Sequence, residues 1–152
     1  MAFETVIKKF DALTLLELYS ILQLRQEVFI VEQDCPYLDA DDKDQAAYHA
    51  FIKDEQGLLV AYTRIIQPGI SYEKYSSIGR VVTSQKARGA KLGLKIMQDS
   101  IDYTKALFPQ SNIKISAQVY ALDFYRYFGF KDIGDAYLED NIPHKAMVLK
   151  IY

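Results

Sequence analysis

The chain has 152 residues, of which half are hydrophobic and a quarter charged, with a net charge of -2 and a single cysteine, Cys35. This composition excludes a disordered chain or a disulfide scaffold and fits one domain over residues 1–152 in a reducing compartment. No apolar run approaches the about 20 residues of a membrane span, and the acidic balance gives no support to nucleic-acid binding, so we expect a cytoplasmic protein.

The first half of the chain predicts a short strand over residues 5–10 and a helix over 14–28. Thr14 and Glu17 have the spacing of a capping box, and the leucines that follow recur at helical intervals. The segment 32–48 contains a proline and a dense acidic run, and it is too long for a simple connection. Long ordered loops in small domains are often functional.

Further along the chain, alternating and periodic apolar residues predict six more strands and two more helices. Gly57 and Gly129 stand where a turn and a helix end need a left-handed residue. The order β-α-β-β-β-α-β-α-β-β predicts an α/β (α+β) fold, with a mixed sheet covered by helices. The predicted strands are 48–54, 58–67, 76–84, 112–119, 130–138 and 145–151, and the predicted helices are 92–108 and 121–128.

A glycine-containing basic turn, RGAKLG, lies between the strand at 76–84 and the helix that follows. Four cations and no acid fall between residues 86 and 95. A helix N-terminus with nearby glycines and cations favours an anion such as a phosphate. The alternative is that Gly89 only makes the turn and Gly93 only a packing contact.

Two longer segments resemble the motifs of a known family. RVVTSQKARGAKLGLKIM (80–97) resembles motif A of the GCN5-related N-acetyltransferases (GNAT), and QVYALDFYRYFGF (118–130) is similar to their motif B. RQEVFIVEQDCPYLDADD (25–42) and YLEDNIPHKAM (137–147) are similar to the ElaA-like subgroup. The resemblance implies a mixed, largely antiparallel central sheet of six to seven strands flanked by helices.

The resemblance also implies acetyl-CoA as the donor substrate, with no metal. Its pyrophosphate would lie at the basic turn and its pantetheine arm along the strand before it, where an amide of Val82 or Thr83 would polarise the thioester carbonyl. Lys91 replaces a motif glycine, and Gln118 stands where many members have Asn. The implied cofactor-binding residues are Val81, Val82, Thr83, Arg88, Gly89, Ala90, Lys91, Leu92, Gly93 and Gln118.

Tyr125 is the family-matched general acid, which would protonate the departing CoA thiolate. Glu32 is a candidate general base if burial raises its pKa, and so is His144, whose Ile-Pro-His context resembles the subgroup. Each has a structural alternative: a core ring for Tyr125, a loop hydrogen bond for Glu32 and a satisfied imidazole for His144. For His49 we favour the structural role.

Other polar residues each have a structural and a functional interpretation. The run Asp39, Asp41, Asp42 and Asp44 does not have calcium-loop spacing, and we interpret it as a solvated loop, with the rim of a pocket for a cationic amine as the alternative. Arg25 and Arg80 are expected to pair with carboxylates, unless one holds a substrate carboxylate. Cys35 lacks a paired base in the sequence, which favours a structural thiol over an acyl-cysteine.

The sequence therefore predicts an N-acetyltransferase that moves an acetyl group from acetyl-CoA to a primary amine of a small molecule or peptide by direct attack. A CoA-binding sensor or scaffold without turnover is the alternative. Acyl transfer in lactone-signal synthesis is a third hypothesis, which is based only on the pattern of Arg25, Val28 and Phe29. A homodimer is left open.

Overall fold

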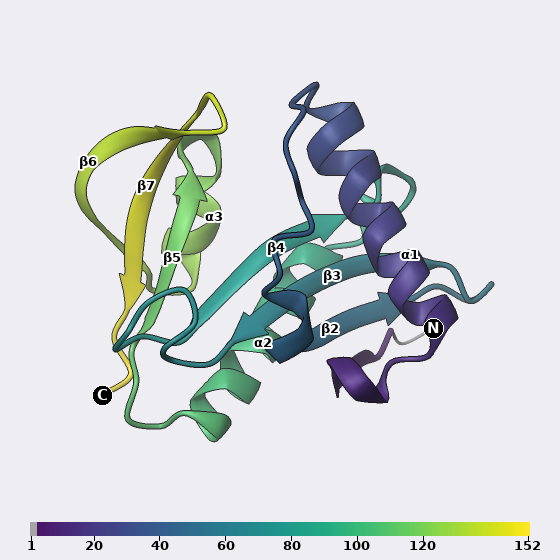
Figure 1. Cartoon of the computed structure of the whole chain (residues 1–152), viewed down its shortest axis with the longest axis horizontal. Helices are drawn as coiled ribbons and strands as arrows, with labels where there is room; N and C mark the ends of the chain where they lie inside the picture. Colours follow the sequence, from purple (N-terminus) through teal and green to yellow (C-terminus); the bar gives the residue numbers. More distant parts are fainter. Residues whose placement is uncertain (1–2) are drawn as a thin grey trace.

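The structure, a computed structural model, describes residues 3–152 and contains seven strands in two sheets. The first sheet is antiparallel, in the order β1-β2-β3-β4, and the second is antiparallel, in the order β5-β7-β6. One parallel bridge, between Ser76 and Ile113, joins them. Figure 1 shows that β4 and β5 run side by side at this bridge and diverge beyond it. The strands are β1 (Thr5–Lys9), β2 (Tyr48–Lys53), β3 (Leu59–Ile66), β4 (Ser77–Thr83), β5 (Ile113–Gln118), β6 (Lys131–Glu139) and β7 (Ile142–Leu149).

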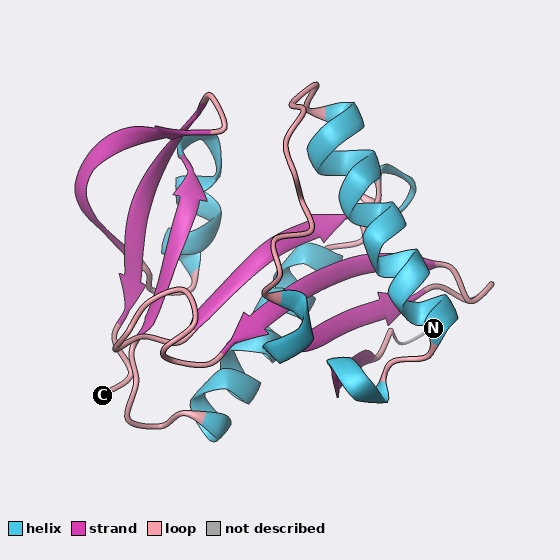
Figure 2. Ribbon diagram, in the orientation of Figure 1, coloured by secondary structure: helices cyan, strands magenta, loops and turns pink. Residues whose placement is uncertain are grey.

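The first sheet is covered on both faces. Successive side chains of a strand point to opposite faces, so Phe51 and Tyr62 pack against α1 (Leu15–Arg25), whereas Ala50 and Ala61 pack against α2 (Leu92–Leu107). This double burial explains why β3 is buried along its whole length. Figure 2 shows the two helices on opposite sides of the four strands.

The first helix begins as predicted and ends differently. The Thr14 side chain accepts a hydrogen bond from the Glu17 amide, and the Glu17 carboxylate accepts one from the Thr14 amide, which confirms the capping box. After Arg25 the chain continues as a π-helical segment, η2 (Gln26–Glu32). Such segments are rare and frequent at functional sites, and this one brings residue 32 to the end of β4.

The second sheet is covered on one side by α3 (Leu122–Tyr127), and its edge strand β6 is largely exposed. The last two strands differ from the prediction: β7 begins at Ile142 rather than at residue 145. Asp140 and Asn141, both with positive φ, make a two-residue turn of the kind that favours Asn and Asp. The tight turn places Glu139 opposite Ile142.

The largest buried cluster lies between the two sheets and the middle of α2, around Met97, Ile101, Phe130 and Met147. The described residues also form four short 3₁₀ segments: η1 (Phe10–Ala12), η3 (Asp44–Ala46), η4 (Gln85–Ala87) and η5 (Val119–Ala121). Within residues 3–152, none of the helices has both the length and the apolar character needed to cross a membrane.

Candidate active site

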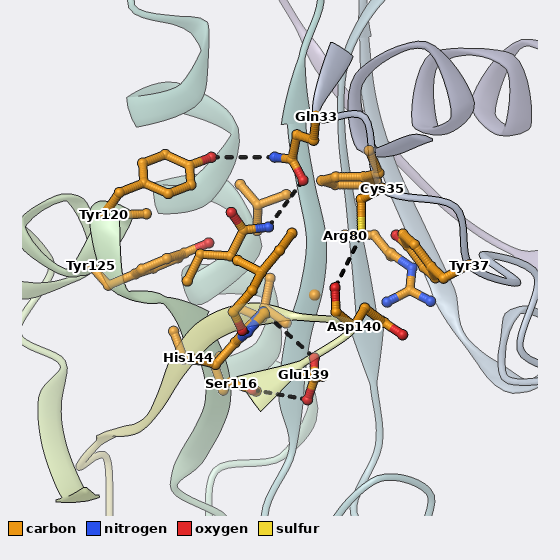
Figure 3. A pocket seen from close by; sticks show the side chains of 18 residues that line it. Gln33, Cys35, Tyr37, Arg80, Ser116, Tyr120, Tyr125, Glu139, Asp140 and His144 are labelled. Carbon is orange, nitrogen blue, oxygen red and sulfur yellow. Dashed lines mark hydrogen bonds and ion pairs between the residues drawn. The ribbon is translucent and has the colours of Figure 1, made fainter. Parts of the chain in front are cut away.

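The divergence of β4 and β5 opens a cavity between the two sheets. Each strand has a ladder partner on its outer side only, β3 for β4 and β7 for β5, so beyond the Ser76–Ile113 bridge their facing edges are unpaired. The cavity between them has a volume of about 130 Å³. Side chains from the loop after η2, from both strands, from η5 and α3, and from the β6–β7 turn line it (Figure 3).

The backbone of β4 presents Thr83 to this free edge. The Ser84 amide donates to the carbonyl of Val60 in β3, so Ser84 and Val60 are a hydrogen-bonded pair of the ladder. Such pairs alternate along an antiparallel ladder, and the register pairs Val82 with Tyr62 and Thr83 with Ala61. The Val82 amide is therefore directed at β3, whereas the amide and carbonyl of Thr83 point away from it.

A bulge interrupts β4 just before these residues. The register with β3 shifts between Tyr62 and Arg64, and Arg80 in the bulge has a φ of 52°. A positive φ in a residue other than glycine is strained and must be held by surrounding contacts. The contacts are ion pairs of the Arg80 guanidinium, with Asp39 at 2.7 Å and with Asp41 at 3.3 Å.

After β4 the chain passes through η4 into the basic turn, and α2 begins within this turn, at Leu92. Lys91 is the N-cap and has the left-handed conformation, with a φ of 59°, that a glycine would adopt without strain. Gly89 also has a positive φ, and open space surrounds the position of a β-carbon there. Residues 88–91 are exposed, and Gly93 lies against Phe124 and Thr83.

Arg88 and Glu32 pair across this turn. Two guanidinium nitrogens donate to the two carboxylate oxygens at 2.8 and 2.9 Å, and one of them also donates to the Thr83 carbonyl at 3.1 Å. Glu32 is exposed, and this pairing lowers the pKa of its carboxyl group. The raised pKa that a general base at Glu32 requires is therefore not found, because Glu32 is not buried and its partner is a cation.

Tyr125 lines the cavity from α3. Its ring packs edge to face against Phe124 and Phe130, and no hydrogen bond to its hydroxyl is found within residues 3–152. Burial raises the pKa of this hydroxyl, so it carries its proton at neutral pH. Gln118, at the end of β5, also lines the cavity and donates to the Gln33 side chain at 3.3 Å.

His144 lies on β7 at the opposite side of the cavity and is 7% exposed. Its Nδ1 is 2.6 Å from the Ile142 carbonyl. Because a carbonyl only accepts, Nδ1 carries the proton and the neutral ring has its lone pair on Nε2. The nearest charged group to Nε2 is the Glu139 carboxylate, at 3.6 Å (Figure 3).

The hydrogen bonds of His49 and Cys35 indicate structural roles for both side chains. Both ring nitrogens of His49 are bonded, to the Tyr62 hydroxyl at 2.6 Å and to the Asp44 carbonyl at 2.8 Å, and the side chain is fully buried. This agrees with the structural role that we favoured. The Cys35 thiol donates to the Asp140 carbonyl at 3.2 Å, which ties the loop after η2 to the β6–β7 turn.

The acidic run is not the solvated loop that we expected. Asp39 and Asp44 are buried and form ion pairs with the fully buried Arg25 at 2.7 and 2.8 Å. Asp41 and Asp44 pair with Arg64 at 2.7 and 2.9 Å. The pairing predicted for Arg25 and Arg80 is thus confirmed, and the run holds the loop against β3 and β4 instead of forming a rim for an amine. Of the run, only Asp42 is exposed.

The structure brings Val81, Gln118, Tyr125 and His144 together around one cavity. Val82 and Thr83 lie further along β4, and Glu32 lies with Arg88 at the exposed basic turn, which continues to Gly93. Sequence reasoning missed Glu139 and Asp140. The signal that could have found them is the Asp-Asn turn, which brings residue 139 next to β7 and hence to His144.

No group of three or more His, Cys, Asp or Glu side chains in the described part of the chain is arranged to hold a metal ion. The basic turn and the free strand edges, by contrast, fit a long anionic thioester. They combine amides at a helix start, cations and two unpaired backbone edges, which suit phosphates and an amide-containing arm.

Comparisons with known proteins agree with this arrangement. Residues 26–151 match the family described as "Acetyltransferase (GNAT) domain". The chain is 37% identical over 142 residues to Protein ElaA of Escherichia coli, with 91% of each chain covered. The crystal structure of Escherichia coli ElaA superposes with a TM-score of 0.90 at 33% identity, covering 98% of this chain and 100% of that one. An acyl-CoA N-acyltransferase from Pseudomonas aeruginosa gives a TM-score of 0.90 at 38% identity, covering 97% and 99%.

Proposed function

Because this chain belongs to the acetyltransferase (GNAT) domain family, ElaA-like subgroup, we propose that it is an N-acetyltransferase that uses acetyl-CoA and a primary amine. Membership supports acyl transfer in general. One observation carries the finer proposal: the unpaired edges of β4 and β5 face each other across a small cavity that contains the Tyr125 hydroxyl and a free imidazole nitrogen.

The donor would lie between these edges. The basic turn, from Arg88 to Gly93, would hold the pyrophosphate through amides at the start of α2, with Lys91 adding a cation. Val81 and Thr83 would accept the pantetheine arm as an added strand, with Val82 and Gln118 beside it. Of the two amides considered for the thioester carbonyl, the orientation of the ladder favours that of Thr83.

Acetyl-CoA supplies the thioester, and the chain's own groups would move the protons. His144 Nε2 would take a proton from the incoming ammonium, and the resulting neutral amine forms the C–N bond as the C–S bond breaks. Tyr125 would give its proton to the sulfur and would be restored by the second proton of the nitrogen. His144 would then release the first proton to solvent. The net reaction converts an ammonium and a thioester into an amide, a thiol and one proton.

Release of free thiol from acetyl-CoA with and without added amines tests this proposal. We expect acceptor-dependent release that is first order in enzyme. Saturable binding of acetyl-CoA without thiol release above background for any amine would overturn the proposal and leave the CoA-binding sensor.

A further inference from the structure

The mouth of the cavity and the hollow beside it carry exposed carboxylates. Glu139 and Asp140, from the β6–β7 turn, line the cavity. An adjoining hollow shares Asp140 with the cavity and adds Asp34. Within residues 3–152, no lysine or arginine pairs with any of these three carboxylates; the nearest charged partner of Glu139 is His144. Figure 3 shows Glu139 and Asp140 at the same side of the cavity.

The cavity offers no free cation to a substrate carboxylate. Arg80 is the one lysine or arginine among the residues lining it. Its guanidinium pairs with Asp39 and Asp41 and donates to the Asp39 carbonyl at 2.9 Å. An acceptor with a carboxylate would therefore meet Glu139 and Asp140 without a compensating partner, which costs affinity.

A second, independent observation points to a ligand at this place. His144 is 7% exposed, yet its Nε2 forms no hydrogen bond within residues 3–152 and faces the cavity. Nε2 is not one of the buried atoms that lack a partner, so it is open to the cavity and a ligand can reach it. A free ring nitrogen beside a carboxylate has the chemistry to receive the proton of an ammonium group.

We propose that the acceptor is a small dication without a carboxylate, a diamine or short polyamine, which binds with one amine at His144 Nε2 and a second ammonium between Asp140 and Asp34. The proposal rests on the acyl transfer proposed above. The attacking nitrogen must be neutral when it reacts, so its attraction to the carboxylates is lost at that moment. A second ammonium keeps its charge throughout, and it holds the acceptor in place while the first one reacts.

Three acceptors with four carbon atoms each test this proposal with the unmodified enzyme: 1,4-diaminobutane, butylamine and 4-aminobutyrate. They differ only in the group at the far end, which is cationic, apolar or anionic. We expect kcat/KM for acetyl-CoA-dependent thiol release to be at least about tenfold higher for the diamine than for butylamine, and lowest for 4-aminobutyrate.

The outcomes separate the two proposals. Turnover that is equal for the diamine and butylamine, or highest with 4-aminobutyrate, would overturn the dication site and leave the acetyltransferase intact. No acceptor-dependent thiol with any of the three, nor with other amines, would overturn the proposed function itself.

Variants locate the site. Asp140→Asn combined with Asp34→Asn should reduce the ratio of diamine to butylamine kcat/KM to within about threefold of one, because the second ammonium loses both carboxylates. Asp135→Asn, on exposed β6 outside the cavity lining, is the matched control and should keep the ratio. An unchanged ratio in the double variant would overturn the placement of the second ammonium.

Discussion

Two groups of three carboxylates have opposite surroundings. Asp39, Asp41 and Asp44 meet three arginines, Arg25, Arg64 and Arg80, in a network that is buried against β3 and β4. Asp34, Glu139 and Asp140 are exposed at the cavity and the hollow beside it, and they have no arginine or lysine partner within residues 3–152. The first group is balanced in charge, and the second is not.

This difference distinguishes carboxylates that stabilise the fold from carboxylates that are available to a ligand. A buried carboxylate needs a paired cation to offset desolvation, so the first group is fixed in number and geometry by its arginines. An exposed carboxylate needs no partner and remains available to a ligand. We therefore expect changes in the balanced group to reduce stability, and changes at the cavity to alter activity with little effect on stability.

Arg25→Met gives the largest expected effect. The substitution leaves Asp39 and Asp44 buried with one arginine partner fewer, and breaking a buried pair in this way costs about 3–5 kcal/mol. Urea unfolding followed by circular dichroism measures the loss. Asp140→Asn is the control and should change the free energy of unfolding by less than about 0.5 kcal/mol. An equally small loss of unfolding free energy for Arg25→Met would contradict the contrast between the two groups of carboxylates.

Tyr125→Phe tests the expectation that changes at the cavity alter activity and not stability. The ring keeps its edge-to-face contacts with Phe124 and Phe130, and the lost hydroxyl has no hydrogen bond within residues 3–152. We expect kcat to fall by about 10²-fold, the lower end for a general acid, with the KM for acetyl-CoA and the unfolding midpoint almost unchanged. Unchanged kcat in the folded variant would show that Tyr125 is not the acid.

The sequence predicts most of the fold because local signals agree with tertiary packing. The Thr14–Glu17 capping box, the alternation of β5 and the left-handed Gly129 all occur as predicted. The π-helical end of the first helix was not predictable from periodicity, because its residues continue the helical pattern of α1. The start of β7 was missed because Pro143 and the Asp-Asn turn obscure the short hairpin.

Of the candidate site, the part that we propose for the donor has a sequence signal, and most of the part that we propose for the acceptor has none. The basic turn and β4 are contiguous in sequence, so a single motif describes them. Glu139, Asp140 and His144 come together only through the register of β6 with β7, and the run at Asp39 is balanced by arginines 14 to 41 residues away. Long-range pairing of this kind leaves no local pattern.

Acid sensitivity should belong to the balanced group. Arg64 lowers the pKa of Asp41, although burial opposes it, and the same arginine and Arg25 lower that of Asp44. A carboxyl group whose folded pKa is depressed contributes stability above its unfolded pKa of about 4, and the contribution is lost as pH falls through the folded pKa. Between pH 5 and pH 2, Asp41→Asn should therefore show a fall in unfolding free energy that is about 1–2 kcal/mol smaller than that of the wild type. Parallel pH profiles for the two proteins would contradict this.

Glu32→Gln tests whether the exposed pair at the basic turn is a base or a competitor for the donor. Without the carboxylate, Arg88 is free for a phosphate, and an exposed pair of this kind contributes at most about 1 kcal/mol. We expect the Kd for acetyl-CoA, measured by calorimetry, to fall about threefold with kcat unchanged. Glu27→Gln, also exposed on η2, is the control. A large loss of kcat would instead assign the base to Glu32.

Lys91→Gly gives the smallest expected effect, because an exposed cation and a strained backbone change together. Glycine relieves the left-handed conformation, but it also gains freedom in the unfolded chain, so the net stabilisation should be about 0.5 kcal/mol. The Kd for acetyl-CoA should stay within about twofold if backbone amides hold the pyrophosphate. Lys91→Ala removes the same charge and keeps the strain, so weaker binding in both variants would show that the ammonium contributes. Weaker binding in the glycine variant alone would show that the fixed backbone at residue 91 contributes instead.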